Sequence, residues 1–278
     1  MKAQVIGTSR YLTVNGRMAF VETYGQGRPL LCIHSAGQSG VQWRHSIAGL
    51  ADLGYQVIVP DLPGHGRSEL PADGPVTDLG VYAAFCVDLL RTLSVTRPYV
   101  VGCSIGGKIA LDIATRIPGE LAGVVTMAAD AHNTDGQSDA GLLRAMEDAV
   151  SPSRSDRTYY GTLLACGASV DAARREVIAE MHRREDPQVS TSDLIAWNRH
   201  DLRDRLTGIT CPVHLLVGAD DFWMNPASAE ATADRITGAR FTVLDGIGHY
   251  PMEEIVDFPA VLHGWLSELP TSPTPLGG

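Results

Sequence analysis

The chain has 278 residues, of which 44% are hydrophobic and 19% charged, and 22 basic against 32 acidic side chains give a net charge of −10. This size and composition predict one packed α/β domain with an insertion and exclude a disordered chain. The acidic balance, without a basic block or a run of 18 apolar residues, argues against nucleic acid and membranes as partners.

The N-terminal segment and the cysteines bear on the compartment of the protein. Residues 1–10 lack the apolar core of a secretory signal peptide. The five cysteines are odd in number and scattered through apolar stretches, which is typical of small buried side chains in a reducing compartment. We therefore expect a cytoplasmic protein without a disulfide framework.

The first third of the chain opens with a hairpin and continues with a buried strand. Residues 10–14 and 18–24 flank Asn15-Gly16, the strongest short hairpin signal. Residues 30–33 form a continuous apolar run, which is typical of a buried parallel strand. A loop over residues 34–40 follows this strand at its carboxyl end.

Strands and helices then alternate. The pattern predicts a helix over about residues 42–53, a strand over 56–59, a tight turn over 61–68 and an amphipathic helix over 77–93. This alternation indicates a parallel sheet with helices on both faces.

The sequence Gly-x-Ser-x-Gly stands between a predicted strand and a predicted helix. The apolar run over 99–101 leads into Gly102 and Ser104, and the helical pattern after Gly106 stops at Pro118. A strand that reverses into a helix within a few residues leaves no room for flanking side chains, so glycine is needed on both sides of the serine. This context predicts a nucleophile elbow with Ser104 at its tip.

The alternation breaks after the next strand, over 121–129. Residues 131–206 contain helical patterns and no convincing strand, so we interpret them as an inserted helical cap; the patterns cover 142–150, 171–184 and 192–199. The sheet resumes over 212–217 and 240–244, and a helix over 257–269 closes the fold. Residues 1–130 and 207–270 thus form the predicted core, and 271–278 a flexible tail.

A serine nucleophile needs a base within hydrogen-bond reach, and the base needs an orienting acid. Asp220 and Asp221 end the strand over 212–217, and His249 lies in a short loop after the following strand. The order Ser, Asp, His is the one that the elbow fold uses, and all three would project from the carboxyl edge of the sheet. Asp130, at the end of the strand after the elbow, is an alternative acid.

These motifs together resemble the α/β-hydrolase superfamily over nearly all of residues 5–269. The elbow, the His34 loop, the turn at residues 64–68, the acid three residues after Gly218 and the Gly248-His249 pair all stand in family order. The resemblance implies a mostly parallel eight-stranded sheet with helices on both faces, a helical cap over the site, and hydrolysis without a cofactor. It favours Asp221 over Asp130 and Asp220 as the acid.

Two backbone N–H groups should hold the oxyanion. One is expected from Ile105, directly after the nucleophile at the positive end of a helix. The family pattern puts the second on Ala36. This sequence has Ser35 where the family usually has glycine, which adds a hydroxyl that could reach the substrate.

Other side chains complete the predicted site. Trp197 and Tyr159 in the cap, and Trp223 after the acid, are candidates for substrate contact together with Ser35. His34 is expected to brace its loop and His65 to stabilise its turn, while Lys108 is expected to be solvated or salt-bridged. The remaining histidines lack the spacing of metal ligands, so we expect no metal: His45, His132, His182, His200, His214 and His263.

The sequence therefore predicts a serine hydrolase that cleaves an ester or lactone of a small, largely uncharged metabolite. Cleavage of a carbon–carbon bond next to a ketone is the nearest alternative. A slow ligand-binding or receptor-like protein, and a cofactor-free lyase or oxygenase, are further alternatives on the same fold. The oligomeric state and the substrate do not follow from the sequence.

Overall fold

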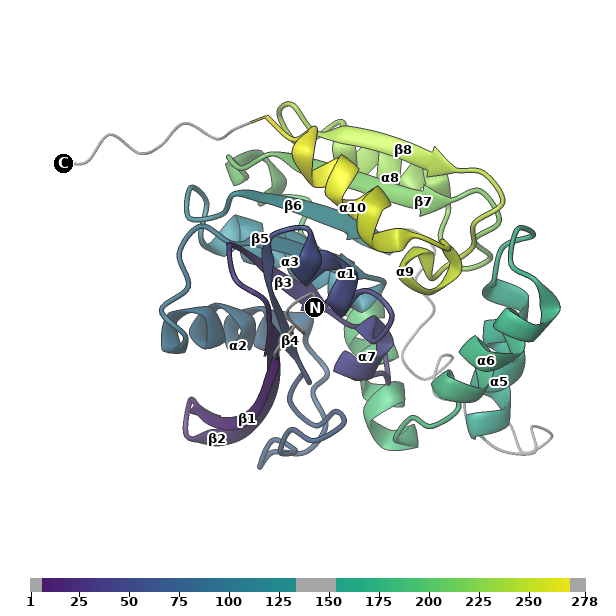
Figure 1. The fold of residues 1–278 in the computed structure, drawn as a ribbon, viewed down its shortest axis with the longest axis horizontal. Helices are drawn as coiled ribbons and strands as arrows, with labels where there is room; N and C mark the ends of the chain where they lie inside the picture. The colour runs from purple at the N-terminus through teal and green to yellow at the C-terminus, as the bar shows by residue number, and fades with distance from the viewer. Residues whose placement is uncertain (1–6, 134–153, 271–278) are drawn as a thin grey trace, which may run out of the picture.

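The computed structural model describes residues 7–133 and 154–270, and an eight-stranded sheet runs through it (Figure 1). The strand order is β1-β2-β4-β3-β5-β6-β7-β8. The pairs β1–β2 and β2–β4 are antiparallel and the other neighbours are parallel, which confirms the predicted sheet. The strands are β1 (Gly7–Val14), β2 (Arg17–Tyr24), β3 (Arg28–Ile33), β4 (Tyr55–Pro60), β5 (Tyr99–Cys103), β6 (Gly123–Met127), β7 (Val213–Gly218) and β8 (Arg240–Leu244).

The hairpin between β1 and β2 turns at Asn15 and Gly16, as predicted. Their φ angles are 51° and 76°. Two consecutive positive φ angles are typical of the type I′ turn, whose twist matches that of the flanking strands.

Side chains along the central strands alternate between two apolar cores, one on each face of the sheet. In β3, Leu31 and Ile33 pack with α2 and α3, whereas Leu30 and Cys32 pack with α1 and α10. Both faces are therefore covered, which explains why the strand is a continuous apolar run. The helices outside the insertion are α1 (Ile47–Asp52), α2 (Leu79–Thr92), α3 (Ile105–Arg116), α8 (Pro226–Ala233), α9 (Pro251–Glu254) and α10 (Phe258–Ser267).

The helix predicted over residues 42–53 is wrong in its first half. The chain forms a short 3₁₀ helix, η1 (Gly40–Trp43), and α1 begins at Ile47. The break between them lets Gln42 and Trp43 both point inward, where they are 4% and 0% exposed. Side-chain contacts hold this short helix, since Asp61 Oδ1 accepts the Gly40 N–H and Gln42 Oε1 accepts the Ser35 N–H.

Between β6 and β7 the structure describes three α-helices, which we call the helical insertion: α5 (Arg154–Ala165), α6 (Ala172–His182) and α7 (Pro187–Arg199). In Figure 1, α5 and α6 lie beyond the arrowheads of β7 and β8. A bridge between His132 and Asp201 joins the two chain segments at its base. The predicted helix over 142–150 and the tail over 271–278 lie outside the described residues.

A buried ion pair ties α7 to the core. Asp193 of α7 is 0% exposed, and its Oδ2 lies 2.8 Å from His65 Nε2. His65 Nδ1 lies 3.2 Å from the Pro63 carbonyl oxygen, so both ring nitrogens face acceptors. In the protonated ring, both N–H groups therefore have a hydrogen-bond acceptor. Burial lowers the pKa of His65, but the charge and hydrogen bond of Asp193 outweigh it, so that the pKa lies above its ordinary value.

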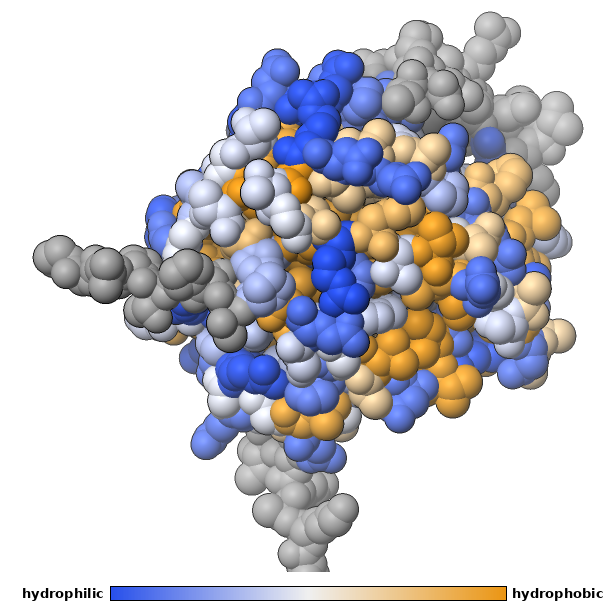
Figure 2. Space-filling model, turned by 90° about the horizontal axis from the view of Figure 1, so that it is seen from above, coloured by the Kyte–Doolittle hydropathy of each residue, from blue (hydrophilic) through white to orange (hydrophobic). Residues whose placement is uncertain are grey.

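On the face seen from above, hydrophobic areas lie between hydrophilic ones (Figure 2). No helix within residues 7–133 and 154–270 is long and apolar enough to cross a membrane.

The elbow glycines give a direct test of the close packing between β5 and α3. A Cβ at Gly102 would lie 2.1 Å from the Gly106 carbonyl oxygen, whereas a Cβ at Gly264 in α10 would meet nothing within 4 Å. We expect Gly102→Ala to lower the free energy of unfolding by about 1–3 kcal/mol, the usual cost of overpacking. Gly264→Ala is the control and should raise it by about 0.5–1 kcal/mol. Urea unfolding measures both, and equal shifts in the two variants would contradict the predicted clash.

The His65–Asp193 pair predicts a pH-dependent contribution to stability. A folded-state pKa above the unfolded value stabilises the fold below the unfolded pKa, and this contribution disappears as the pH rises through the folded-state pKa. His65→Gln keeps a hydrogen-bond donor without the charge. We expect the difference in unfolding free energy between wild type and His65→Gln to be largest in acid and to shrink above pH 6.5 or so. In an Asp193→Asn background this pH dependence should vanish. If the free-energy difference changed with pH there as it does with Asp193 present, the His65–Asp193 pair would not be its cause.

Candidate active site

Ser104 stands at the turn between β5 and α3 in a strained backbone conformation. Its φ of 58° and ψ of −121° are unusual for a residue with a side chain. A Cβ at Gly106 would lie 2.6 Å from the carbonyl oxygens of both Ile33 and His34. Glycine is therefore required on this side of the serine, and the elbow packs directly against the end of β3.

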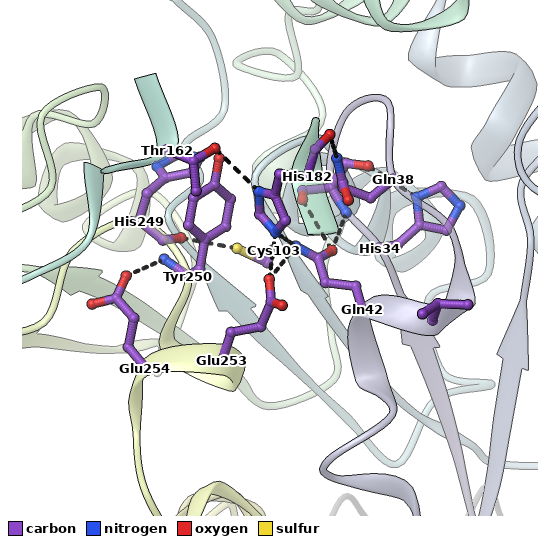
Figure 3. Close-up of polar contacts among 12 residues, drawn as sticks. His34, Gln38, Gln42, Cys103, Thr162, His182, His249, Tyr250, Glu253 and Glu254 are labelled. Carbon is purple, nitrogen blue, oxygen red and sulfur yellow. Dashed lines mark hydrogen bonds and ion pairs between the residues drawn. The ribbon is translucent and has the colours of Figure 1, made fainter. Parts of the chain in front are cut away.

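His249 and Asp221 form a hydrogen-bonded pair. His249 is 5% exposed, and its Nδ1 lies 2.9 and 2.8 Å from the two carboxylate oxygens of Asp221. Asp221 Oδ1 also accepts the backbone N–H groups of Trp223 and Met224, which fix the carboxylate. The thiol of Cys103, the residue before Ser104, donates to the His249 carbonyl oxygen at 3.1 Å (Figure 3). The loop of the candidate base therefore lies against the elbow.

The two alternative acids are engaged elsewhere. Asp130 Oδ1 lies 2.5 Å from Lys108 Nζ, and its Oδ2 accepts the Ser228 hydroxyl at 2.6 Å. Asp220 Oδ2 accepts the Ala168 N–H at 2.7 Å. The geometry thus favours Asp221. Within the described ranges, no three His, Cys, Asp or Glu side chains are arranged to hold a metal ion.

Lys108 is salt-bridged, and the alternative of a solvated side chain is wrong. It is fully buried, and its Nζ lies 5.4 Å from the centre of the Trp197 ring. Burial lowers the pKa of Lys108, and the Asp130 carboxylate opposes this shift. Lys108 therefore has a charged partner and a cation–π contact inside the fold.

The loop after β3 forms a tight turn that is held on both sides. The Gln38 N–H donates to the Ser35 carbonyl oxygen, and Gly37 has a φ of 67°, as the third position of a type II turn requires. The Ser35 N–H donates to Gln42 Oε1 at 2.9 Å. The Gly37 N–H donates to Asp193 Oδ2 at 2.8 Å.

Ala36 and Ile105 present unpaired N–H groups. The neighbours of Ala36 in the turn all donate to protein acceptors, but in the described part of the chain the Ala36 N–H has none. The Ile105 N–H opens α3, where no preceding helical turn offers a carbonyl, and it too lacks an acceptor among the described residues. The arrangement can therefore supply the two donors that an oxyanion needs.

His34 braces the turn as a neutral ring. Its Nε2 accepts the Leu62 N–H at 3.0 Å, so its Nδ1 carries the proton and donates to the Ser35 carbonyl oxygen at 2.9 Å. Burial, together with the nearby charge of His65, lowers the pKa of His34 to about 4. These contacts agree with the structural role expected for His34.

Among the predicted substrate contacts, Trp223 lies against the candidate base. Its ring meets the His249 ring edge-on, with centroids 4.9 Å apart, and it also packs over Gly161 of α5. Trp223 and the adjacent Phe222 remain 42% and 73% exposed. Trp223 can therefore contact an apolar group that approaches His249.

The other predicted contacts are engaged within the protein. The Tyr159 hydroxyl bonds Glu176 of α6, and this hydrogen bond raises the pKa of Tyr159 to about 12. Trp197 covers Lys108, and the Ser35 hydroxyl donates to Gln42 Oε1 at 3.0 Å. The geometry favours Trp223 over these three as a substrate contact.

Sequence reasoning missed the carboxylate that holds the base loop. Glu254 accepts the N–H groups of Gly248, Tyr250 and Gly167 at 2.6–2.9 Å, so one side chain fixes both flanks of His249 and the end of α5. Burial raises the pKa of Glu254, and these hydrogen bonds oppose the shift. An acidic residue five positions after a histidine carries no sequence signal of such a role.

Comparisons with known proteins identify the family of the chain. The sequence matches the profile of the Alpha/beta hydrolase family over residues 30–262. The magnesium-chelatase 30 kDa subunit of Rhodobacter capsulatus is 32% identical over 255 residues, which cover 86% of this chain and 87% of that protein. An uncharacterized protein of Mycobacterium tuberculosis is 38% identical over 112 residues. This match spans 40% of this chain and about a third, 32%, of that protein's length.

Solved structures share the fold. A thermophilic esterase from Thermogutta terrifontis superposes with a TM-score of 0.78 at 25% identity, covering 96% of this chain and 99% of the esterase. The family profile spans most of the chain, and the eight-stranded sheet with its elbow agrees with it. The chain belongs to the alpha/beta hydrolase family.

Proposed function

We propose that this protein is a serine hydrolase that cleaves an ester or lactone of a small, largely uncharged metabolite. The observation that carries the proposal is the His249–Asp221 pair, whose loop lies against the strained elbow at Ser104. A carboxylate on Nδ1 leaves Nε2 of the same ring free to take a proton. A nucleophile, a base and an orienting acid are thus supplied by the ends of three strands.

In the proposed reaction, Ser104 Oγ attacks the carbonyl carbon while His249 Nε2 takes the hydroxyl proton. The developing oxyanion accepts hydrogen bonds from the N–H groups of Ile105 and Ala36. His249 then returns the proton to the leaving alcohol oxygen, which in a lactone stays attached to the acyl group. A water molecule, activated by the same histidine, releases the acid and restores Ser104.

One further observation supports ester bonds as the target, and another bears on the substrate's polarity. The solved structure of the thermophilic esterase shares the fold over nearly the whole chain. The partly exposed ring of Trp223, beside His249, would favour an apolar group on the substrate.

Covalent labelling tests the nucleophile. A fluorophosphonate probe should add its mass to the peptide that contains Ser104 and abolish turnover of a panel of esters and lactones. Ser104→Ala should show neither labelling nor turnover. An unlabelled Ser104 in folded protein would contradict the proposal, and turnover restricted to vinylogous diketones would instead indicate carbon–carbon bond cleavage.

Asparagine substitutions test the acid. Asp221→Asn should reduce kcat by about 10⁴, the cost of losing the orienting carboxylate of a serine protease, with little change in unfolding free energy. Asp130→Asn should act on stability and cost about 3–5 kcal/mol, because it leaves the Lys108 charge buried without its partner. Asp220→Asn is the matched control. If Asp221→Asn keeps more than about a tenth of the turnover while folded Asp130→Asn loses it, the acid is Asp130.

A further inference from the structure

Gln42 is a buried side chain with no part in the proposed chemistry, and it bonds the turn that carries Ala36. It is 4% exposed, and its Oε1 accepts both the N–H and the hydroxyl of Ser35, at 2.9 and 3.0 Å. A backbone N–H can only donate, so the amide oxygen must face Ser35. The amide nitrogen therefore points the other way, toward Glu253 Oε2 at 3.1 Å.

Glu253 joins this amide to the helical insertion. It is 3% exposed, and the oxygen that accepts from Gln42 also lies 2.6 Å from His182 Nε2 of α6 (Figure 3). Its other oxygen accepts from Arg44 at 3.3 Å. Burial raises the pKa of Glu253, but His182, Gln42 and Arg44 outweigh burial and hold it below its ordinary value.

The insertion contacts the same turn at a second point. The His182 carbonyl oxygen accepts the Gln38 side-chain amide at 3.2 Å, and His182 Nδ1 lies 3.4 Å from the Thr162 hydroxyl of α5. Gln38 closes the turn by donating to the Ser35 carbonyl oxygen. His182 therefore reaches the turn directly through Gln38 and indirectly through Glu253 and Gln42.

We infer that Gln42, held by Glu253 and His182, is a positioning residue that sets the direction of the Ala36 N–H. The inference rests on the proposed function, since it gives the Ala36 N–H the task of holding an oxyanion. Gln42 Oε1 accepts two hydrogen bonds from Ser35 and so fixes the residue that carries the next peptide group. The Ser35 carbonyl oxygen, which shares its peptide plane with the Ala36 N–H, accepts from the Gln38 N–H and from His34 Nδ1. The helical insertion thereby takes part in forming the oxyanion hole, and does not merely cover it.

A reciprocal exchange of the two side chains tests this inference. Gln42→Glu places a second carboxylate against Glu253, and Glu253→Gln removes the acceptor charge. The double variant Gln42→Glu/Glu253→Gln keeps an acceptor for Ser35 and again pairs the two side chains as acceptor and donor. Gln42→Leu removes the contact with Ser35, and Val41→Ala, at the exposed neighbouring position of η1, is the control.

Loss of a whole oxyanion donor costs about 10²–10³ in kcat, so we expect each single variant at Gln42 to lower kcat about tenfold or more with KM nearly unchanged. The double variant should recover most of this loss. Amide hydrogen exchange in a peptide spanning residues 30–40 should accelerate in Gln42→Leu and stay at the wild-type rate in Val41→Ala.

The inference is overturned if kcat stays within about twofold of wild type in Gln42→Leu, or if the double variant is no better than the singles. Faster amide hydrogen exchange in Gln42→Leu with unchanged kcat would show that Gln42 only stabilises the turn, and this would overturn the inference as well. Fluorophosphonate labelling of wild-type Ser104 separates the two questions. If Ser104 is labelled but the double variant does not recover kcat, only the role of Gln42 is contradicted. If wild type shows neither labelling nor turnover, the proposed function is contradicted, and this inference with it.

Discussion

The close approach of two backbone segments at Gly106 sets the geometry of the site. The first turn of α3 meets the carbonyl oxygens of Ile33 and His34 at a distance that no Cβ would tolerate. Because of this contact, the elbow that carries Ser104 and the loop that begins at His34 are built against each other. This contact also brings the two unpaired N–H groups to the same place. The Ile105 N–H opens the helix that contains Gly106, and the Ala36 N–H stands two residues after His34.

Buried carboxylates hold the irregular loops at this edge of the sheet. Loops lack the regular hydrogen bonds of helices and strands, so their buried N–H groups need other acceptors, and charged acceptors bind them strongly. Asp61, Asp193, Glu254 and Asp221 each accept one or more loop N–H groups. Several acidic residues of this acidic chain thus act inside the fold, where each has a specific partner.

The sequence predicts those parts of the fold and site that depend on neighbouring residues. Alternating strands and helices, the glycines around Ser104, and a histidine in a short loop after a strand are local patterns, so their physical causes lie within a few positions. Gln42 and Glu253 are 211 positions apart, and His65 and Asp193 are 128 apart. Such pairs become visible only when the chain is folded, because each member alone resembles an ordinary surface residue.

The cap residues illustrate the same limit. Tyr159 and Trp197 stand out in a polar segment, which suggests substrate contact, yet their partners Glu176 and Lys108 explain both side chains within the fold. Whether an aromatic ring faces a ligand or covers a neighbour depends on the rotation of its helix against the core. That rotation is fixed by contacts such as Asp193 with His65, which no local pattern of α7 reveals.

Lys108 shows why the geometry favours the proposed acid at the end of β7 over the alternative at the end of β6. Lys108 stands one helical turn after Ser104, so the helix that begins after Ser104 also carries a fully buried ammonium group. A buried charge without a partner is costly, and Asp130 is the carboxylate that faces it. If Asp130 turned toward His249, Lys108 would lose its partner and Ser228 its acceptor. Apart from His249, the partners of Asp221 among the described residues are backbone N–H groups, which orient its carboxylate without neutralising it.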